Sequence, residues 1–244
     1  MFDLLYSIFI LGLTHKITIF SSSEKLKPLF FYKLTQNSRN MTVDESLNYA
    51  NTLVGLPFRW FVPGQVIFTG DDAFWCENSP APTAAEIKQN DKSIVCAGFP
   101  NLLRRFCGLT IPGLNGNIVG KHKKYYMEFP GGTGAWFLYL YQRKRLQKID
   151  LKRSYPKGTL LIARFKSDEL DQGHLAVVYS EGTLIRDQLV IHSSPDIDYA
   201  NSGEHKNHGA VKIEPFHVGN NLWREKKPSY YSFVCLPEDW LLKD

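Results

Sequence analysis

The arrangement of hydrophobic and polar residues predicts a helix shortly after residue 40. Thr42 is followed three residues later by Glu45, which is the signature of a capping box. Apolar residues then recur at helical spacing until Gly55 and Pro57 interrupt them. We therefore expect a first helix over about residues 43–54.

Two further helices are expected downstream. Pro100 has no N–H group and is tolerated only in the first turn, so a second helix must begin close to residues 96–99. The basic pair at residues 104–105, followed by Gly108, suits the C-terminal end of that helix. A third helix is expected over about residues 133–146, after a Gly-Gly pair.

The pattern changes to short strands in the second half of the chain. Segments rich in β-branched and aromatic residues are separated there by Gly, Asp, Asn or Pro. Helices followed by strands predict an α+β domain with a mainly antiparallel sheet. The expected strands cover residues 159–165, 174–180, 189–193, 210–216 and 230–236.

Composition and charge limit the classes of function. The chain has 244 residues, 43% of them hydrophobic, which is enough for one sizeable core. The formal net charge is +5, but residues 1–40 supply +3 of it through five basic and two acidic residues, which leaves about +2 for the rest. We therefore expect no nucleic acid partner, because such domains normally carry a dominant basic face. The four cysteines form no CxxC pair, so neither a disulfide scaffold nor a zinc site is expected.

Residues 1–40 differ in character from residues 41–244, which we expect to form the catalytic domain. Residues 1–13 are mostly apolar, but they are fewer than the roughly 20 residues of a membrane span. Their first charged residue is acidic, whereas a secretory signal begins with basic residues. If residues 1–20 act as a signal or anchor, they contact a membrane and the protein is secreted or held at a surface. The alternatives are a packed strand or helix, or an extension with no role in the fold. Residues 21–40 are expected to form a tether, and the sequence leaves compartment and oligomeric state open.

Cys96 is the strongest candidate for a chemically active residue. The second expected helix begins beside it, and the N–H groups and dipole of a helix N-terminus favour thiolate over thiol. His174 opens an expected strand after Gly173 and is a candidate general base for this thiol. His192 lies in the next expected strand, 18 residues further on (192 − 174). Adjacent antiparallel strands would bring the two imidazoles together, so that His192 orients His174 through the ring nitrogen that does not face the thiol.

These residues belong to motifs that, in this order, resemble those of the NlpC/P60 cysteine peptidases. The resemblance covers about residues 43–195 and implies a papain-like α+β fold, with the nucleophile at a helix N-terminus packed on a mainly antiparallel sheet. It implies Cys96 as nucleophile, His174 as general base and acid, and His192 as the orienting third group. It also implies a thiol hydrolase of amide or isopeptide bonds in peptidoglycan-type peptides, with no cofactor. The motifs are Cys96-Ala97-Gly98-Phe99, Gly158-Thr-Leu-Leu-Ile-Ala-Arg-Phe, Gly173-His174-Leu-Ala-Val-Val-Tyr and Val190-Ile191-His192-Ser193, preceded by Leu56-Pro57-Phe58-Arg59-Trp60.

The sequence departs from the family pattern at three positions. Val95 replaces the aspartate that the family uses to hold the amino group of the substrate, and Ala97 replaces the usual serine. Phe58 replaces a tyrosine whose hydroxyl would help to hold the oxyanion. Gln65 or the indole of Trp60 would be substitute donors, beside a backbone N–H group at the helix start.

Two other functions remain open at this point. An acyltransferase or transamidase would use the same Cys96 acyl-enzyme but pass the acyl group to an amine or lipid acceptor. A catalytically silent relative would bind cell walls or proteins instead.

The other cysteines and histidines are expected to have no catalytic role. Cys107 falls at the wrong electrostatic end of the second helix and Cys235 in an apolar strand, so both are expected to be packing residues. Cys76 is expected to be an exposed thiol. The three histidines within residues 205–217 are expected to lie in a solvated loop rather than to bind a metal.

Overall fold

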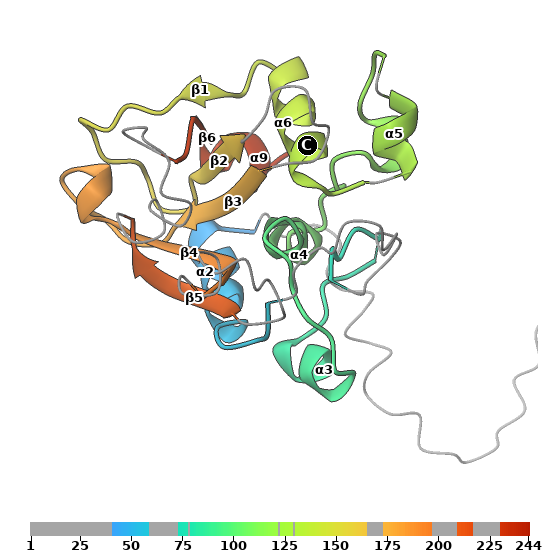
Figure 1. Ribbon diagram of the computed structural model, residues 1–244, viewed down its shortest axis with the longest axis horizontal. Helices are drawn as coiled ribbons and strands as arrows, with labels where there is room; N and C mark the ends of the chain where they lie inside the picture. Colours follow the sequence, from blue (N-terminus) through green and yellow to red (C-terminus); the bar gives the residue numbers. More distant parts are fainter. Residues whose placement is uncertain are drawn as a thin grey trace, which may run out of the picture. The chain divides into compact units, whose positions relative to one another are not determined.

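The computed structural model contains one antiparallel sheet of six strands, in the order β1-β6-β2-β3-β4-β5 (Figure 1). The expected α+β class with a mainly antiparallel sheet is therefore confirmed. The strands are β1 (Gln147–Lys148), β2 (Leu160–Arg164), β3 (Gly173–Val178), β4 (Leu189–Pro195), β5 (Gly209–Pro215) and β6 (Phe233–Cys235). The structure describes residues 41–58, 73–77, 79–121, 123–128, 130–164, 173–196, 209–216 and 230–244, so the arm expected in residues 1–40 lies outside it.

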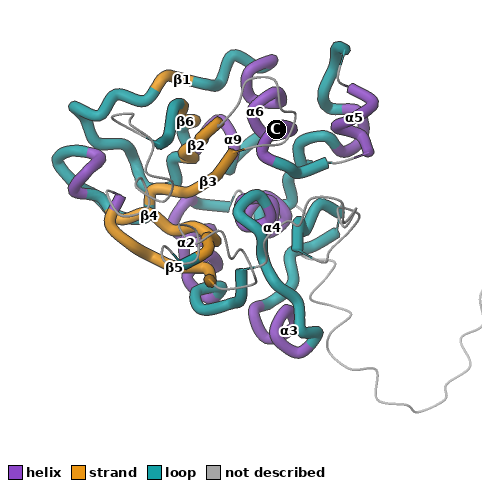
Figure 2. Tube along the Cα trace, in the orientation of Figure 1, coloured by secondary structure: helices purple, strands orange, loops and turns teal. Residues whose placement is uncertain are grey.

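Most of the helices precede the sheet along the chain, as expected, and Figure 2 shows the loops that connect them. None of the helices in the described ranges is long and apolar enough to cross a membrane. The three expected helices are present as α2, α4 and α6, whereas α3, α5, α9 and strand β1 were not expected. The α-helices are α2 (Val43–Thr52), α3 (Ala84–Gln89), α4 (Gly98–Phe106), α5 (Lys123–Glu128), α6 (Thr133–Gln142) and α9 (Pro237–Trp240), and two 3₁₀ turns cover Leu114–Gly116 and Ile185–Asp187.

Local signals account for the ends of these helices. The capping box at the start of α2 is formed, because the N–H of Glu45 donates to Thr42 Oγ1 at 3.2 Å and the N–H of Thr42 donates to the Glu45 carboxylate at 2.9 Å. Helix α6 ends at Gln142, four residues earlier than expected. Lys144 has a left-handed backbone there (φ +56°), and the N–H of Arg145 bonds back to the carbonyl of Leu140 at 3.0 Å, which closes the helix.

Cys96 lies two residues before the first residue of α4, in the turn that leads into the helix. Ala97 already has helical backbone angles (φ −78°, ψ −27°). The first hydrogen bond between residues four apart runs from the N–H of Phe99 to the carbonyl of Val95, at 3.2 Å. The expected position of Cys96 at the N-terminal end of this helix is therefore confirmed.

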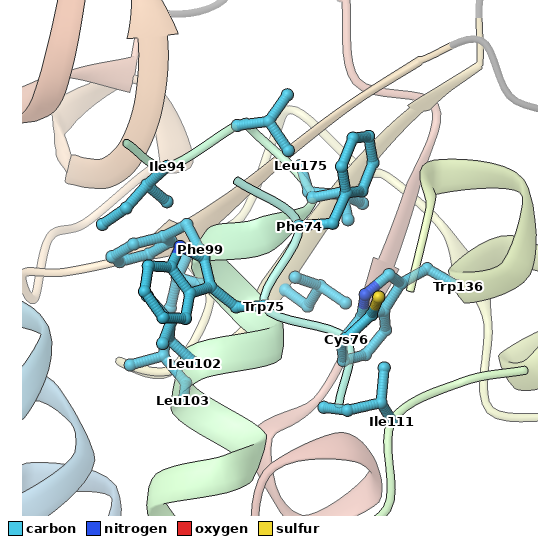
Figure 3. Close-up of a cluster of buried hydrophobic side chains, with 14 of the residues drawn as sticks. Phe74, Trp75, Cys76, Ile94, Phe99, Leu102, Leu103, Ile111, Trp136 and Leu175 are labelled. Atoms are coloured by element: carbon cyan, nitrogen blue, oxygen red, sulfur yellow. The ribbon is translucent and has the colours of Figure 1, made fainter. Parts of the chain in front are cut away.

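Helix α4 forms the centre of the larger hydrophobic core, and the segment 73–76 crosses its start (Figure 3). The N–H of Val95 donates to the carbonyl of Ala73 at 3.0 Å. A Cβ atom at Gly98 would lie 2.2 Å from the same carbonyl oxygen, so only glycine allows the segment to pass this close. The covering segment and the helix start are thereby held against each other beside Cys96.

The sheet has two different faces, because alternate residues of a strand point to opposite sides. One face packs on α2, α4 and α6 and belongs to the larger core, with Leu160, Ile162, Leu175, Val177, Ile191, Val211 and Cys235. The other face belongs to a smaller cluster with Leu161, Ala163, Ala176, Val178, Val190 and Val234, over which Tyr155, Ile185, Phe216, Tyr230 and Tyr231 pack.

Strands β3 and β4 separate at one end of the sheet, and we call this region the β3–β4 seam. Within the described strands, their pairing ends at Val177↔Ile191. Strand β3 nevertheless stays paired with β2 back to Gly173, and β4 stays paired with β5 out to Pro195. At the seam the Ser193 hydroxyl donates to the carbonyl of Ile94 at 2.6 Å. The segment that leads into Cys96 is therefore anchored where the two strands part.

Candidate active site

Two buried histidines meet across the β3–β4 seam. His174 on β3 and His192 on β4 lie on the face of the smaller cluster and are 4% and 0% exposed. The distance from His174 Nε2 to His192 Nδ1 is 2.8 Å, and the two rings are nearly perpendicular at 79°. The expected adjacency of these imidazoles is therefore confirmed.

A carboxylate continues this chain of contacts. Glu214 on β5 places Oε1 2.9 Å from Nε2 of His192, and its side chain is 16% exposed. The sequence analysis did not identify Glu214. Along β5, Val211 and Ile213 face the larger core, so Glu214 points to the opposite face of the sheet, where His192 lies. This alternation is visible in the sequence, but it identifies Glu214 as a partner of His192 only once the pairing of β4 with β5 is known.

The chain of contacts fixes which nitrogens carry protons when both rings are neutral. A carboxylate only accepts hydrogen bonds, so His192 must donate from Nε2 to Glu214. Nδ1 of His192 then accepts, and Nε2 of His174 must donate to it. This leaves Nδ1 of His174 as the ring nitrogen that can take up a further proton.

Burial keeps His174 in its neutral form. It lowers the pKa of His174 well below its ordinary value, and the positive charges of His192, when that ring is protonated, and of Lys212 lower it further. At neutral pH its imidazole is therefore unprotonated and can accept a proton at Nδ1, but the lowered pKa makes it a weaker base than an ordinary histidine.

Tyr231 packs beside His174. Its ring centroid is 6.2 Å from that of His174. Burial raises the pKa of the Tyr231 hydroxyl well above its ordinary value, and the negative charges of Glu214 and Cys96 raise it further. At neutral pH Tyr231 is therefore a neutral phenol packed beside His174.

Cys96 approaches from the helical side of the sheet. It is partly buried and packs against the larger core, whereas the two histidines face the smaller cluster. The connection between the two faces is the β3–β4 seam, where Ser193 holds the carbonyl of Ile94, two residues before Cys96. The structure therefore brings His174 and His192 together and bonds the segment before Cys96 to Ser193, the residue of β4 that follows His192.

The two proposed oxyanion donors, Trp60 and Gln65, lie outside the described residues, as do the three histidines within residues 205–217. Where the structure describes the chain, it contains no cluster of three or more His, Cys, Asp or Glu side chains suited to a metal ion. The histidine pair itself does not fit a metal, because the ring nitrogens point at each other at 2.8 Å rather than at a common point.

The three positions that depart from the NlpC/P60 pattern are all buried. Phe58 is 2% exposed, Val95 6% and Ala97 1%. The N–H of Phe58 donates to the carbonyl of Gly209 at 3.0 Å, and Phe58 pairs with Ile94 in a short parallel bridge. These side chains therefore pack the surroundings of Cys96 rather than offer polar groups to a ligand.

All four cysteines lie in the described part of the chain, and none of them forms a disulfide. The expectation that Cys76 is an exposed thiol is wrong. Cys76 is 2% exposed, because the segment 73–76 packs onto α4 and the turn at Gly131. Cys235 is fully buried, as expected, and burial raises its pKa far above the ordinary thiol value. Cys107 at the other end of α4 is partly buried and lies 3.1 Å from the hydroxyl of Ser46.

Comparison of the chain with protein-family models, with curated proteins and with solved structures found no match in any of the three.

Proposed function

We propose that this protein is a thiol hydrolase that cleaves amide or isopeptide bonds through a Cys96 acyl-enzyme. The observation that carries the proposal is the 2.8 Å contact between His174 and His192, because it leaves Nδ1 of a buried, neutral His174 as the base. The position of Cys96 just before the N-terminus of α4 supports it, since the positive end of a helix favours both a thiolate and an oxyanion.

The proposed reaction has two stages. Nδ1 of His174 takes the thiol proton as the Cys96 sulfur attacks the carbonyl carbon, and the oxyanion forms at the N-terminal end of α4. The same proton passes from His174 to the leaving amine, which departs and leaves a thioester on Cys96. His174 then accepts a proton from water, which attacks the thioester, and the carboxylic acid product leaves with the thiol restored.

Peptidoglycan-type peptides are the substrate class that the resemblance to NlpC/P60 peptidases suggests. The departures bear on how such a peptide would bind. Val95 is buried and apolar where the family has a carboxylate, so the proposed site has no group at that position to bind a free amino terminus. We therefore propose that the acyl side of the substrate is an internal or blocked residue.

The first experiment measures the alkylation of Cys96 by iodoacetamide across pH 4–9, resolved by residue with mass spectrometry. Cys107 is a matched internal control, because it lies at the opposite end of the same helix, is also partly buried, and has its pKa raised by burial. Cys96 should react faster than Cys107 at every pH below 8, and His174→Gln should remove most of this advantage while thermal melting shows that the variant is folded.

Turnover is then tested with peptidoglycan-type peptides, with Cys96→Ala and Cys107→Ala as the paired variants. Cleavage that disappears only in Cys96→Ala supports the proposal. New amide or ester products in the presence of added amines or lipid alcohols identify an acyltransferase instead. Equal alkylation of Cys96 and Cys107, with no effect of His174→Gln, contradicts any thiol chemistry and indicates a binding protein.

A further inference from the structure

We propose that Glu214 is a positioning residue of this site, which holds His192 so that His174 presents Nδ1 as the base. The inference deepens the proposed function and rests on it for its role in the reaction. The contacts themselves, His174 to His192 at 2.8 Å and His192 to Glu214 at 2.9 Å, are independent of that function.

The topology of the sheet explains why Glu214 can act on His174 from a distance. His192 is the cross-strand partner of Lys212, and Val190 is the partner of Glu214, so these side chains share one face of the β4–β5 pair. His174 belongs to the other side of the β3–β4 seam and meets the pair at His192. Glu214 is therefore the last member of a chain that crosses three strands.

The charges around Glu214 keep it ionised. Burial would raise its pKa, but the hydrogen bond from His192 and the positive charges of His192 and Lys212 outweigh burial, so the pKa lies below its ordinary value. Asp196 opposes this effect weakly. Lys212 is itself fixed, because its ammonium group donates to the Asp196 carboxylate at 2.8 Å and to the carbonyl of Pro195 at 3.1 Å.

An ionised Glu214 has two effects on the reaction. Its carboxylate can accept but not donate, so His192 must carry its proton on Nε2, and this tautomer makes Nδ1 of His174 the base. When His174 takes the proton from Cys96, the new positive charge is delocalised towards His192 and balanced by the Glu214 carboxylate. The proton itself stays on His174, so no bond to Glu214 has to break.

The test compares Glu214→Gln and Glu214→Leu with a matched control, Glu181→Gln. Glu181 is an exposed residue of the β3–β4 connection, so its replacement makes the same change in charge away from the site. Glu214→Gln should slow the alkylation of Cys96 at pH 7 by about tenfold or more and move the acid limb of its pH profile to lower pH, because the histidine pair loses its counter-charge. Cys107 in the same molecules should react at an unchanged rate.

The tautomers of the two histidines distinguish a positioning role of Glu214 from a merely structural one, because a structural role would not change them. In protein labelled with ¹⁵N-histidine, the resonances of His174 and His192 are assigned with His174→Gln and His192→Gln, and both rings should carry the proton on Nε2. Glu214→Leu should abolish this single pattern, whereas Glu181→Gln should retain it. Wild-type rings with the proton on Nδ1, or tautomers that Glu214→Leu leaves unchanged, overturn the inference.

The two proposals fail in different ways. If alkylation of Cys96 depends on His174 but its pH profile is unaffected by Glu214→Gln, the positioning role is wrong and the thiol hydrolase stands. If Cys96 shows no dependence on His174, the proposed function fails, and the positioning role in catalysis fails with it, whatever the tautomers show.

Discussion

Replacement of His192 by leucine is a direct test of the buried chain of hydrogen bonds. The change removes the 2.8 Å contact with His174 and the 2.9 Å contact with Glu214 from a side chain that has no solvent exposure. A neutral hydrogen bond contributes about 0.5–1.5 kcal/mol to stability, and one to a charged group about 1.5–3 kcal/mol. The free energy of unfolding of His192→Leu should therefore fall by about 2–4.5 kcal/mol.

His192→Gln is the matched control, because an amide combines an acceptor and a donor as this histidine does. Its oxygen can accept from Nε2–H of His174 while its NH₂ group donates to Glu214, so its stability should stay within about 1.5 kcal/mol of the wild type. Urea denaturation followed by tryptophan fluorescence measures both variants. If the two replacements cost the same free energy of unfolding, the hydrogen bonds described here do not stabilise the fold and the reasoning is wrong.

Three further predictions follow from the same region and from the core. Lys212→Met should move the acid limb of Cys96 alkylation to higher pH, because it removes a positive charge that lowers the pKa of His174, whereas Lys212→Arg should leave the limb in place. The free energy of unfolding should fall as the pH drops below 6.5, by about 1.4 kcal/mol for each unit by which the pKa of His174 is depressed, because only the unfolded chain then binds a proton there. Urea titrations at pH 7 and 5 measure this difference in the free energy of unfolding, which should be smaller in His174→Gln. A wild-type protein that is equally stable at both pH values contradicts the prediction. Asn101→Leu should lower the free energy of unfolding by about 3 kcal/mol or more. The fully buried amide of Asn101 donates to the carbonyls of Phe74 and Gly131 and accepts from the indole N–H of Trp136. A loss below about 1 kcal/mol in the same assay argues against these bonds.

Local patterns predicted the elements that carry the candidate site. The start of α4 followed from Pro100, and the two histidine strands followed from β-branched runs next to Gly173 and before Pro195. Helix α3 was not expected, although Thr83 and Glu86 form the same kind of capping box as the one at α2. The prolines that precede this signal obscured it, since they are typical of irregular segments.

Long-range contacts account for most of what the sequence did not predict. Arg104 was assigned a role at the C-terminal end of α4, but its guanidinium is fully buried and donates to the carbonyls of Thr110 and Trp240 and to the Asp244 carboxylate. Glu214 is a partner of His192 only because β4 and β5 pair in one register, and the connection between them gives no local signal of that register.

The β3–β4 seam runs through the chain of contacts from His174 to Glu214, so its members belong to two parts of the sheet. His174 belongs to the part formed by β1, β6, β2 and β3, whereas His192 and Glu214 belong to the part formed by β4 and β5. A displacement of one part against the other by about 1 Å would break the contact between the rings, and it would strain the short β3–β4 pairing at Val177↔Ile191 and Val178↔Val190 that joins the two parts. The contact of His174 with His192 is therefore tied to the alignment of the two parts of the sheet at this short pairing.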